Sequence, residues 1–169
     1  MHGKNTVMLG LSLLLSLNAC RRDKQPLTPQ PPDWMEPTVS KQVEEIAPEA
    51  APVTPVLAGV AYRSGQRSNY DLELEKGYCY LFSAVGDSTV EELHLNIWNP
   101  EDERVAKAKE PGPGMVMEYC PEVSGKHEFE VKVDDGHGHY LARVFSKQPG
   151  APVAYDPSQA PAPTPRATG

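Results

Sequence analysis

The sequence predicts an all-β domain, a small antiparallel β-sandwich of about seven or eight strands, and two observations support this prediction. Period-two alternation of apolar and polar residues recurs throughout residues 56–147 and is typical of strands that are buried on one side. Turn-forming residues separate the alternating segments at intervals of roughly 8 to 12 positions. Because no part of this span has a long helical period, two packed antiparallel sheets are expected.

Each expected strand has its own sequence pattern. Residues 77–85 are apolar on both faces, which favours a central strand, and residues 115–120 and 139–145 complete the set. Three further segments each have one apolar face, and the residues expected to point inward are Tyr70, Leu72 and Leu74, then Leu93, Leu95 and Ile97, then Phe129, Val131 and Val133.

The amino-terminal segment has the layout of a secretory signal. Lys4 precedes an apolar run over residues 7–17, and the small residue Ala19 precedes Cys20. The run is too short to span a bilayer comfortably. A buried amphipathic helix is the alternative, but the leucines of residues 11–17 are distributed around the whole helix circumference.

The end of this run, Leu17-Asn18-Ala19-Cys20, resembles the lipobox of bacterial lipoproteins. The resemblance implies that residues 1–19 are a signal peptide and that the mature chain begins at a lipid-modified Cys20. Several acyl chains are sufficient for stable membrane anchoring. Because Arg21 rather than aspartate follows the cysteine, the usual sorting rule implies the outer membrane of the cell envelope rather than the inner membrane.

Proline-rich segments flank the predicted domain. Residues 20–55 are expected to form an extended tether, and residues 148–169 a disordered Pro/Ala-rich tail, because frequent prolines interrupt helices and central strands. Within the tether, a short helix is expected over residues 39–47, with Thr38 or Ser40 as its cap. The Trp34-Met35 pair is expected to be part of a solvated spacer, with docking onto the domain as the alternative.

Two cysteines remain inside the domain. After export Cys79 and Cys120 would lie in an oxidising compartment, so a disulfide between them is expected. Buried free thiols are the alternative. A catalytic Cys/His pair is disfavoured because Cys79 lies among bulky residues, whereas a reactive thiol needs an exposed setting.

The order of strands and turns over residues 69–145 resembles the small, jelly-roll-like β-sandwich domains of the bacterial pre-peptidase C-terminal type. The resemblance is carried by Gly77-Tyr78, by the strand from Leu93 to the Asn99-Pro100 turn, and by Gly125 to Val133. It implies a sandwich fold with an accessory or binding role. It implies no set of functional residues.

Enzymatic motifs are absent from the sequence: there is no Gly-x-Ser-x-Gly, no His-Glu-x-x-His and no phosphate-binding glycine loop. No enzyme activity and no cofactor are therefore expected. Asp134, Asp135, His137 and His139 are residue types that bind metals, but a glycine-rich hairpin turn with solvated side chains explains them as well. Residues 99–103, together with Asp134 and Asp135, are oxygen-rich enough to suit calcium.

Aromatic residues suggest a ligand-binding face. Trp98 lies on the polar side of its strand, where Tyr78 and Tyr80, with Tyr62 and Tyr119, could join it to stack on a sugar ring or pack on a partner. The alternative is that Trp98 covers an end of the sandwich or contacts the tether.

Charge and anchor together define the expected function. The net charge is −7, and no basic cluster suits nucleic acid. Besides the membrane contact through Cys20, we expect an unidentified envelope protein or a glycan as partner. The predicted function is a non-catalytic binding module anchored in the envelope, and the alternative is a structural or accessory subunit of a surface or secretion assembly.

Overall fold

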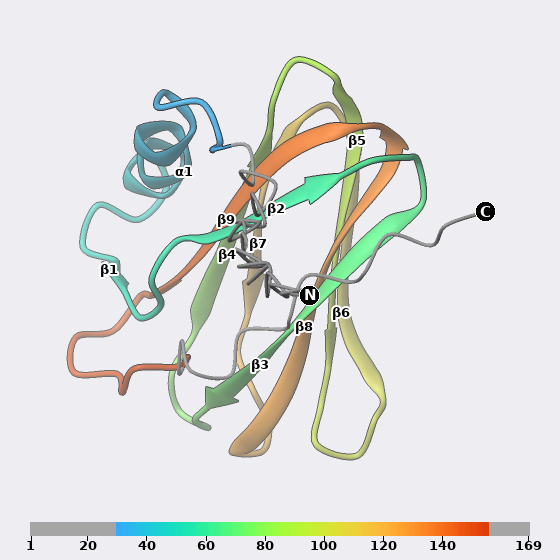
Figure 1. Ribbon diagram of the computed structural model, residues 1–169. Helices are drawn as coiled ribbons and strands as arrows, with labels where there is room; N and C mark the ends of the chain where they lie inside the picture. Colours follow the sequence, from blue (N-terminus) through green and yellow to red (C-terminus); the bar gives the residue numbers. More distant parts are fainter. Residues whose placement is uncertain (1–29, 156–169) are drawn as a thin grey trace, which may run out of the picture.

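The computed structural model describes residues 30–155, and the predicted signal peptide and Cys20 lie outside this range. One helix, α1 (Met35–Glu44), precedes nine strands (Figure 1). The strands are β1 (Ala51–Pro52), β2 (Leu57–Ala61), β3 (Gln66–Leu74), β4 (Tyr80–Gly86), β5 (Val90–Trp98), β6 (Arg104–Pro111), β7 (Gly114–Tyr119), β8 (Gly125–Gly136) and β9 (Gly138–Ser146).

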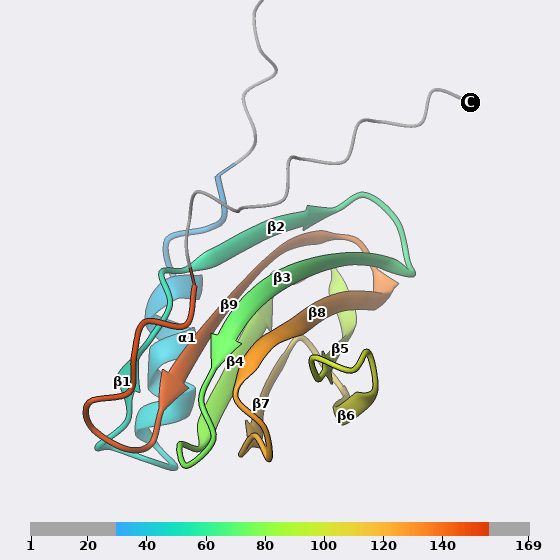
Figure 2. The ribbon, with the colours of Figure 1, turned by 90° about the horizontal axis from the view of Figure 1, so that it is seen from below.

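The strands form two antiparallel sheets. Sheet 1 has the order β1-β9-β4-β7, with β2 also paired to β9, and sheet 2 has the order β3-β8-β5-β6. The two sheets pack face to face, and α1 lies against the side of sheet 1 that faces away from sheet 2 (Figure 2). The predicted all-β sandwich is therefore confirmed.

The core between the sheets contains the residues that the alternation predicts. The three apolar triplets of β3, β5 and β8 are all buried, and they pack against Phe82 and Val144 from sheet 1. Phe82 and Phe129 meet across the sheets with ring centroids 4.9 Å apart. Every residue of β4 is buried, which confirms its prediction as a central strand.

The predicted free tether is corrected for residues 30–55, because this segment is part of the folded domain. Helix α1 begins at Met35, four residues before the predicted start, and Pro37 fits its first turn, where a backbone N–H has no helical partner. Met35, Val39 and Val43 recur every fourth residue and so share one face. That face packs on Leu81, Val85, Leu141 and Phe145 of β4 and β9.

The predicted disordered tail is also corrected in part, because residues 148–155 are folded against the sandwich. The N–H of Ala154 donates to the carbonyl of Val53 at 2.9 Å, and its carbonyl accepts from the N–H of Glu73 at 2.8 Å. Ala154 and Tyr155 are buried in the core. The segment thus joins the edge of sheet 1 to β3 of sheet 2.

Strands β2 and β6 were not among the predicted strands. In β2 a glycine, Gly59, interrupts the alternation, and a side chain there would collide with the ring of Tyr140. In β6 lysines alternate with alanines, which are weak strand formers, and this strand lies at an open sheet edge. No helix within residues 30–155 has the length and apolarity needed to cross a membrane.

Candidate functional site: the outer face of sheet 2

The outer face of sheet 2 is the face turned away from sheet 1. Within residues 30–155 no helix or strand packs on it, whereas α1 covers the equivalent face of sheet 1 (Figure 2). Strand alternation directs one set of side chains to this face. That set includes Arg67, Asn69, Asp71, Glu73, His94, Asn96, Trp98, Lys107, Lys109, Lys126, Glu128, Glu130, Lys132 and Asp134, and the Glu92 carboxylate contacts His94 at its end.

Several polar side chains at the centre of this face are buried, although the sequence pattern predicts them on a solvated side. Asn96 is only 5% exposed and Glu130 only 3%. The amide of Asn96 donates to Glu130 Oε1 at 2.8 Å, and Arg67 Nη1 lies 3.2 Å from Glu130 Oε2. Glu130 is held by Asn96 on one oxygen and by Arg67 on the other, so its carboxylate has a fixed position before any ligand binds.

Asn96 also carries an unpartnered acceptor. Its Oδ1 is buried and has no hydrogen-bond partner among the described residues. Such an orphaned polar atom costs about 1–3 kcal/mol, and functional sites are where such costs are usually tolerated. The outer face of sheet 2 therefore contains a polar group that the fold itself does not satisfy.

At one end of this face, His94 lies between two carboxylates. Its Nε2 is 2.8 Å from Glu92 Oε1 and 3.5 Å from Asp134 Oδ2. The hydrogen bond with His94, followed by that from Lys109, lowers the pKa of Glu92. The hydrogen bond from Lys132 lowers the pKa of Asp134. Both carboxylates are consequently ionised at neutral pH.

The opposite end of the face contains Trp98. In the strand register Trp98 lies between Glu128 of β8 and Arg104 of β6. Burial, followed by the nearby charges of Asp71 and Glu130, raises the pKa of Glu128. Asn69 holds this carboxylate by donating to Glu128 Oε1 at 3.1 Å. A half-buried indole therefore lies beside a fixed hydrogen-bonding group.

The predicted aromatic face is corrected for the tyrosines. Tyr80 is completely buried between the sheets, and its hydroxyl accepts a hydrogen bond from the N–H of Glu75. Tyr78 and Tyr119 are half-buried and pack against the core. Tyr62 is exposed but follows β2 in sheet 1. Trp98 is thus the predicted aromatic residue that lies on the outer face of sheet 2.

The four weak metal candidates at residues 134–139 do not converge. Asp134 binds Lys132 on the outer face of sheet 2, whereas Asp135 accepts a hydrogen bond from Ser64. His139 Nδ1 lies 3.2 Å from Asp87 Oδ2, and His137 is exposed. The strand reversal at Gly136 and Gly138, where φ is positive, directs these residues to different neighbours.

Asp87 is held in its turn by several donors. Burial acts to raise its pKa, but hydrogen bonds from the hydroxyl of Thr89 and from the backbone N–H groups of His139 and Thr89 outweigh burial and lower the pKa to about 2. The Asp87 carboxylate therefore accepts the hydrogen bonds that hold this turn. The Nε2 of His139 is buried with no hydrogen-bond partner among the described residues.

The predicted calcium-type segment at 99–103 forms a turn that is held by Asn99. Asn99 Oδ1 accepts hydrogen bonds from the backbone N–H groups of Glu101 and Glu103, at 3.1 and 2.8 Å. Asp102 takes the left-handed conformation with φ of 62°. The side-chain oxygen of Asn99 is thus engaged in forming the turn.

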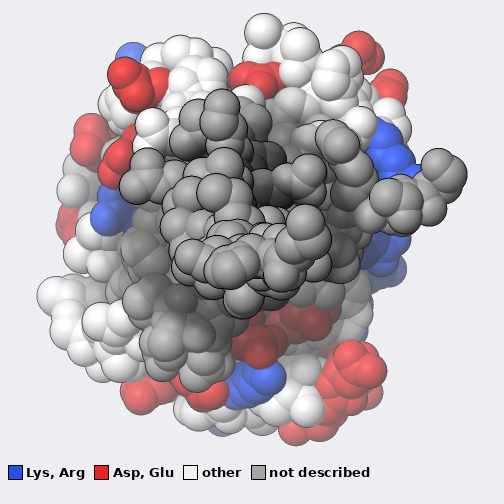
Figure 3. Space-filling model, viewed as in Figure 1, with Lys and Arg blue, Asp and Glu red and all other residues white. Residues whose placement is uncertain are grey.

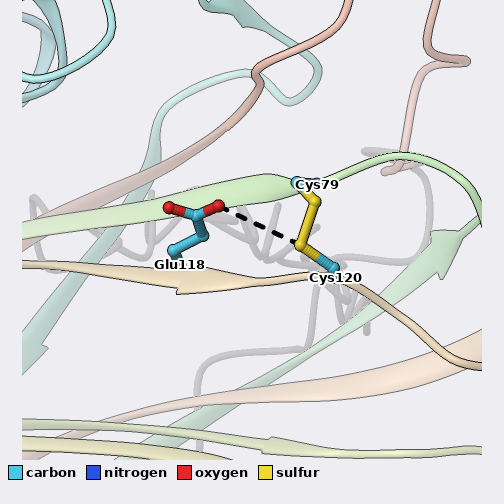
Figure 4. Close-up of side chains that lie close together, drawn as sticks. All are labelled: Cys79, Glu118 and Cys120. Carbon is cyan, nitrogen blue, oxygen red and sulfur yellow. Dashed lines mark hydrogen bonds between the residues drawn. A yellow bond between two sulfur atoms is a disulfide. The ribbon is translucent and has the colours of Figure 1, made fainter.

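The expected disulfide between Cys79 and Cys120 is present. Cys79 directly precedes Tyr80 and Cys120 directly follows its strand partner Tyr119, so the disulfide connects the ends of neighbouring strands β4 and β7, with Cα atoms 4.2 Å apart. Figure 4 shows Glu118 beside this disulfide, with Oε1 4.0 Å from the sulfur of Cys120. Because both sulfurs are in the disulfide, this cluster offers no thiolate for a metal.

Charges are mixed on the surface of the described domain. In the view of Figure 3, acidic and basic side chains are interspersed around the rim of the molecule. On the outer face of sheet 2, ion pairs link acids to lysines, for example Lys126 Nζ to Asp71 Oδ2 at 2.7 Å. This hydrogen bond, with the charge of Asp71, raises the pKa of Lys126.

Sequence reasoning assigned Trp98 to the outward side but missed the cluster around His94. Glu92 and His94 are two residues apart on a strand, which places them on the same side and could have been noted. Their meeting with Asp134 depends on the register between β5 and β8, which includes irregularities at Glu92. Local sequence does not fix that register.

No family model matches the chain, and no curated protein matches its sequence. Several solved structures are similar to it, including the three that follow. The pre-peptidase C-terminal domain of a Bacillus anthracis collagenase is 16% identical, with a TM-score of 0.45, over 53% of this chain and 87% of that one. PliG from Aeromonas hydrophila, a periplasmic inhibitor of g-type lysozyme, is 19% identical, with a TM-score of 0.41, over 54% of this chain and 84% of that one.

The third is a carbohydrate-binding module from Cellvibrio mixtus lichenase 5A, in complex with cellotriose. It is 12% identical, with a TM-score of 0.35, over 60% of this chain and 93% of that one. A domain of the pre-peptidase C-terminal type is thus among the structures similar to this chain.

Proposed function

We propose that this chain is a non-catalytic binding module, anchored in the bacterial outer membrane through a lipid on Cys20, that binds a glycan on the outer face of sheet 2. The observation that carries the proposal is the buried polar group at the centre of that face. Asn96 and Glu130 are fixed there by each other and by Arg67, and Asn96 Oδ1 lacks a partner. Because this oxygen is buried, a ligand donor would satisfy it after a small shift of the side chains that cover it.

The position of this face supports its use for binding. Helix α1 covers sheet 1, so a ligand that approaches a broad sheet surface of the described domain meets sheet 2 (Figure 2). The side chains of a sheet project in parallel rows, which gives a rigid platform without contributions from mobile loops. A rigid platform loses little conformational entropy when it binds.

A hydroxyl-rich ligand fits the chemistry of the face better than an apolar one. The amide of Asn69 and the carboxylate of Glu128 can pair with sugar hydroxyls. Trp98 offers an indole for stacking on the apolar face of a sugar ring. Acidic and basic groups on the same face compensate each other, so the ligand need carry no net charge.

A glycan array with the purified full chain in mild detergent tests this proposal. The wild type is expected to bind a defined set of glycans. Trp98→Ala is expected to weaken that binding by at least about tenfold, because a tryptophan that a bound ligand covers contributes about 2 kcal/mol or more to the binding free energy. Isothermal titration with the best glycan measures the loss. Tyr62→Ala, an exposed aromatic outside this face, is the matched control.

If no glycan binds, the proposal fails, and the alternative of a structural or accessory subunit is favoured. Equal affinities of Trp98→Ala and wild type would show that a different surface carries the ligand.

The membrane anchor is tested separately. Cys20→Ser is expected to move the chain from the membrane fraction to the soluble fraction, because the acylated thiol would be lost. Mass spectrometry of the amino-terminal peptide from wild-type cells is expected to show acyl chains on Cys20 and no residues before it. An intact, unmodified segment 1–20 would contradict the anchor, and with it the expected location.

A further inference from the structure

We propose that Glu92, His94 and Asp134 form a binding site for one divalent transition-metal ion, with Zn²⁺ as the best match, on the outer face of sheet 2. The site goes beyond the proposed glycan binding and does not rest on it. One ligand atom from each of the three residues lies within 4.8 Å of the others. Two neighbouring strands, β5 and β8, supply all three side chains.

The placement of His94 is the central feature. The residue is buried, and its Nε2 is directed between the two carboxylates, 2.8 Å from Glu92 Oε1 and 3.5 Å from Asp134 Oδ2. A histidine fixed by its surroundings presents its ring nitrogen without further loss of side-chain freedom. The imidazole nitrogen thus lies between two oxygen donors.

The two distances from His94 Nε2 approach those of a tetrahedral zinc site, and the two carboxylate oxygens lie within 4.8 Å of each other. With metal–ligand bonds of about 2.0–2.2 Å, adjacent ligand atoms of a tetrahedron are about 3.3–3.6 Å apart. The contact between His94 and Asp134 has this length already. Glu92 Oε1 would have to withdraw from Nε2 by about half an ångström to reach it. A quarter of the Glu92 side chain is exposed, which permits this movement.

Two lysines border the site, and they differ in their expected effect on metal binding. Lys132 contacts Oδ1 of Asp134, which is not the oxygen that faces His94, so this contact can persist and orient the carboxylate when Oδ2 binds the ion. Lys109 contacts Glu92 Oε1, 3.2 Å away, which is the same oxygen that faces His94. Lys109 therefore competes with the ion, but it is 54% exposed and can turn into solvent.

The donor set selects the class of ion. One imidazole nitrogen with two carboxylate oxygens suits Zn²⁺ and similar transition metals, whereas Ca²⁺ and Mg²⁺ prefer oxygen donors alone. Three protein ligands leave a fourth position for water or for a group of a bound molecule.

The experiment titrates Co²⁺, a spectroscopic substitute for Zn²⁺, into the chelator-treated full chain in mild detergent, followed by calorimetric titration of Zn²⁺. Visible Co²⁺ absorption bands of tetrahedral character are expected, together with saturation at one ion per chain. His94→Gln and Asp134→Asn are each expected to weaken binding by at least about tenfold, in line with the loss of a ligand. His137→Gln, an exposed histidine outside the cluster, is the matched control and is expected to bind normally.

A variant of Lys109 distinguishes this site from weak binding by surface acids. Lys109→Met removes the competing cation and is expected to tighten Zn²⁺ binding severalfold, whereas nonspecific binding would gain no tetrahedral bands. Thermal unfolding without metal shows whether each variant is folded. If His94→Gln is not folded, the Zn²⁺ affinity of Asp134→Asn, at a more exposed position, tests the proposal. Absence of saturable binding, or unchanged binding in a folded His94→Gln or Asp134→Asn variant, would overturn the proposal.

Discussion

Replacement of Cys79 and Cys120 together with serine is expected to lower the free energy of unfolding by about 4 kcal/mol. The disulfide joins residues 41 positions apart, so its loss restores considerable chain entropy to the unfolded state. A domain of this size has about 5–15 kcal/mol of stability in total, so the expected loss is a large fraction of it. Chemical denaturation of wild type and double variant measures the difference.

A reducing agent provides the matched control for this prediction. It is expected to destabilise the wild type by about the same amount as the double substitution, and to leave the double variant unchanged, because both treatments remove the same crosslink. The prediction is contradicted if the variant unfolds at the same denaturant concentration as the oxidised wild type.

Met35→Ala is expected to destabilise the domain by about 2–5 kcal/mol, because it removes a fully buried side chain between α1 and sheet 1. Met35 packs in a cluster with Leu81 and Leu141, which do not belong to the core between the sheets. Ile46→Ala, at a position just after the helix that is 61% exposed, is the matched control and is expected to change stability by less than about 0.5 kcal/mol.

Denaturant unfolding curves of both variants test whether α1 is docked on sheet 1 in solution. Equal and small effects would show that α1 is not docked in solution and that residues 30–55 are a free spacer. A large effect for Met35→Ala alone supports the docked helix, and it implies that the connection between Cys20 and the folded domain is short.

The contrast between α1 and β5 shows why sequence patterns succeeded in some places and failed in others. In β5, Leu93, Leu95 and Ile97 alternate with polar residues, and the period itself tells which side is buried. In the segment around α1, the prolines indicated an extended chain, and the burial of Met35 became visible only with its partners on β4 and β9. Tertiary contacts outweighed the local composition there.

The candidate sites show the same division. The outward position of Trp98 follows from alternation, and the pairing of Cys79 with Cys120 follows from there being two cysteines within the domain. The sequence pattern does not predict the burial of Tyr80 or the grouping of Glu92, His94 and Asp134. Both depend on which surfaces and strands come together.

The sequence by itself determined the β-sandwich class, the inward faces of its main strands and the disulfide, because residue period and cysteine number are local properties that need no knowledge of partners. Only the tertiary structure decided that α1 covers sheet 1, that Ala154 joins the two sheets, and that the polar residues of sheet 2 form a fixed and partly buried network. These features arise from strand register and from contacts between residues far apart in the chain, and a local pattern does not tell which surfaces come together.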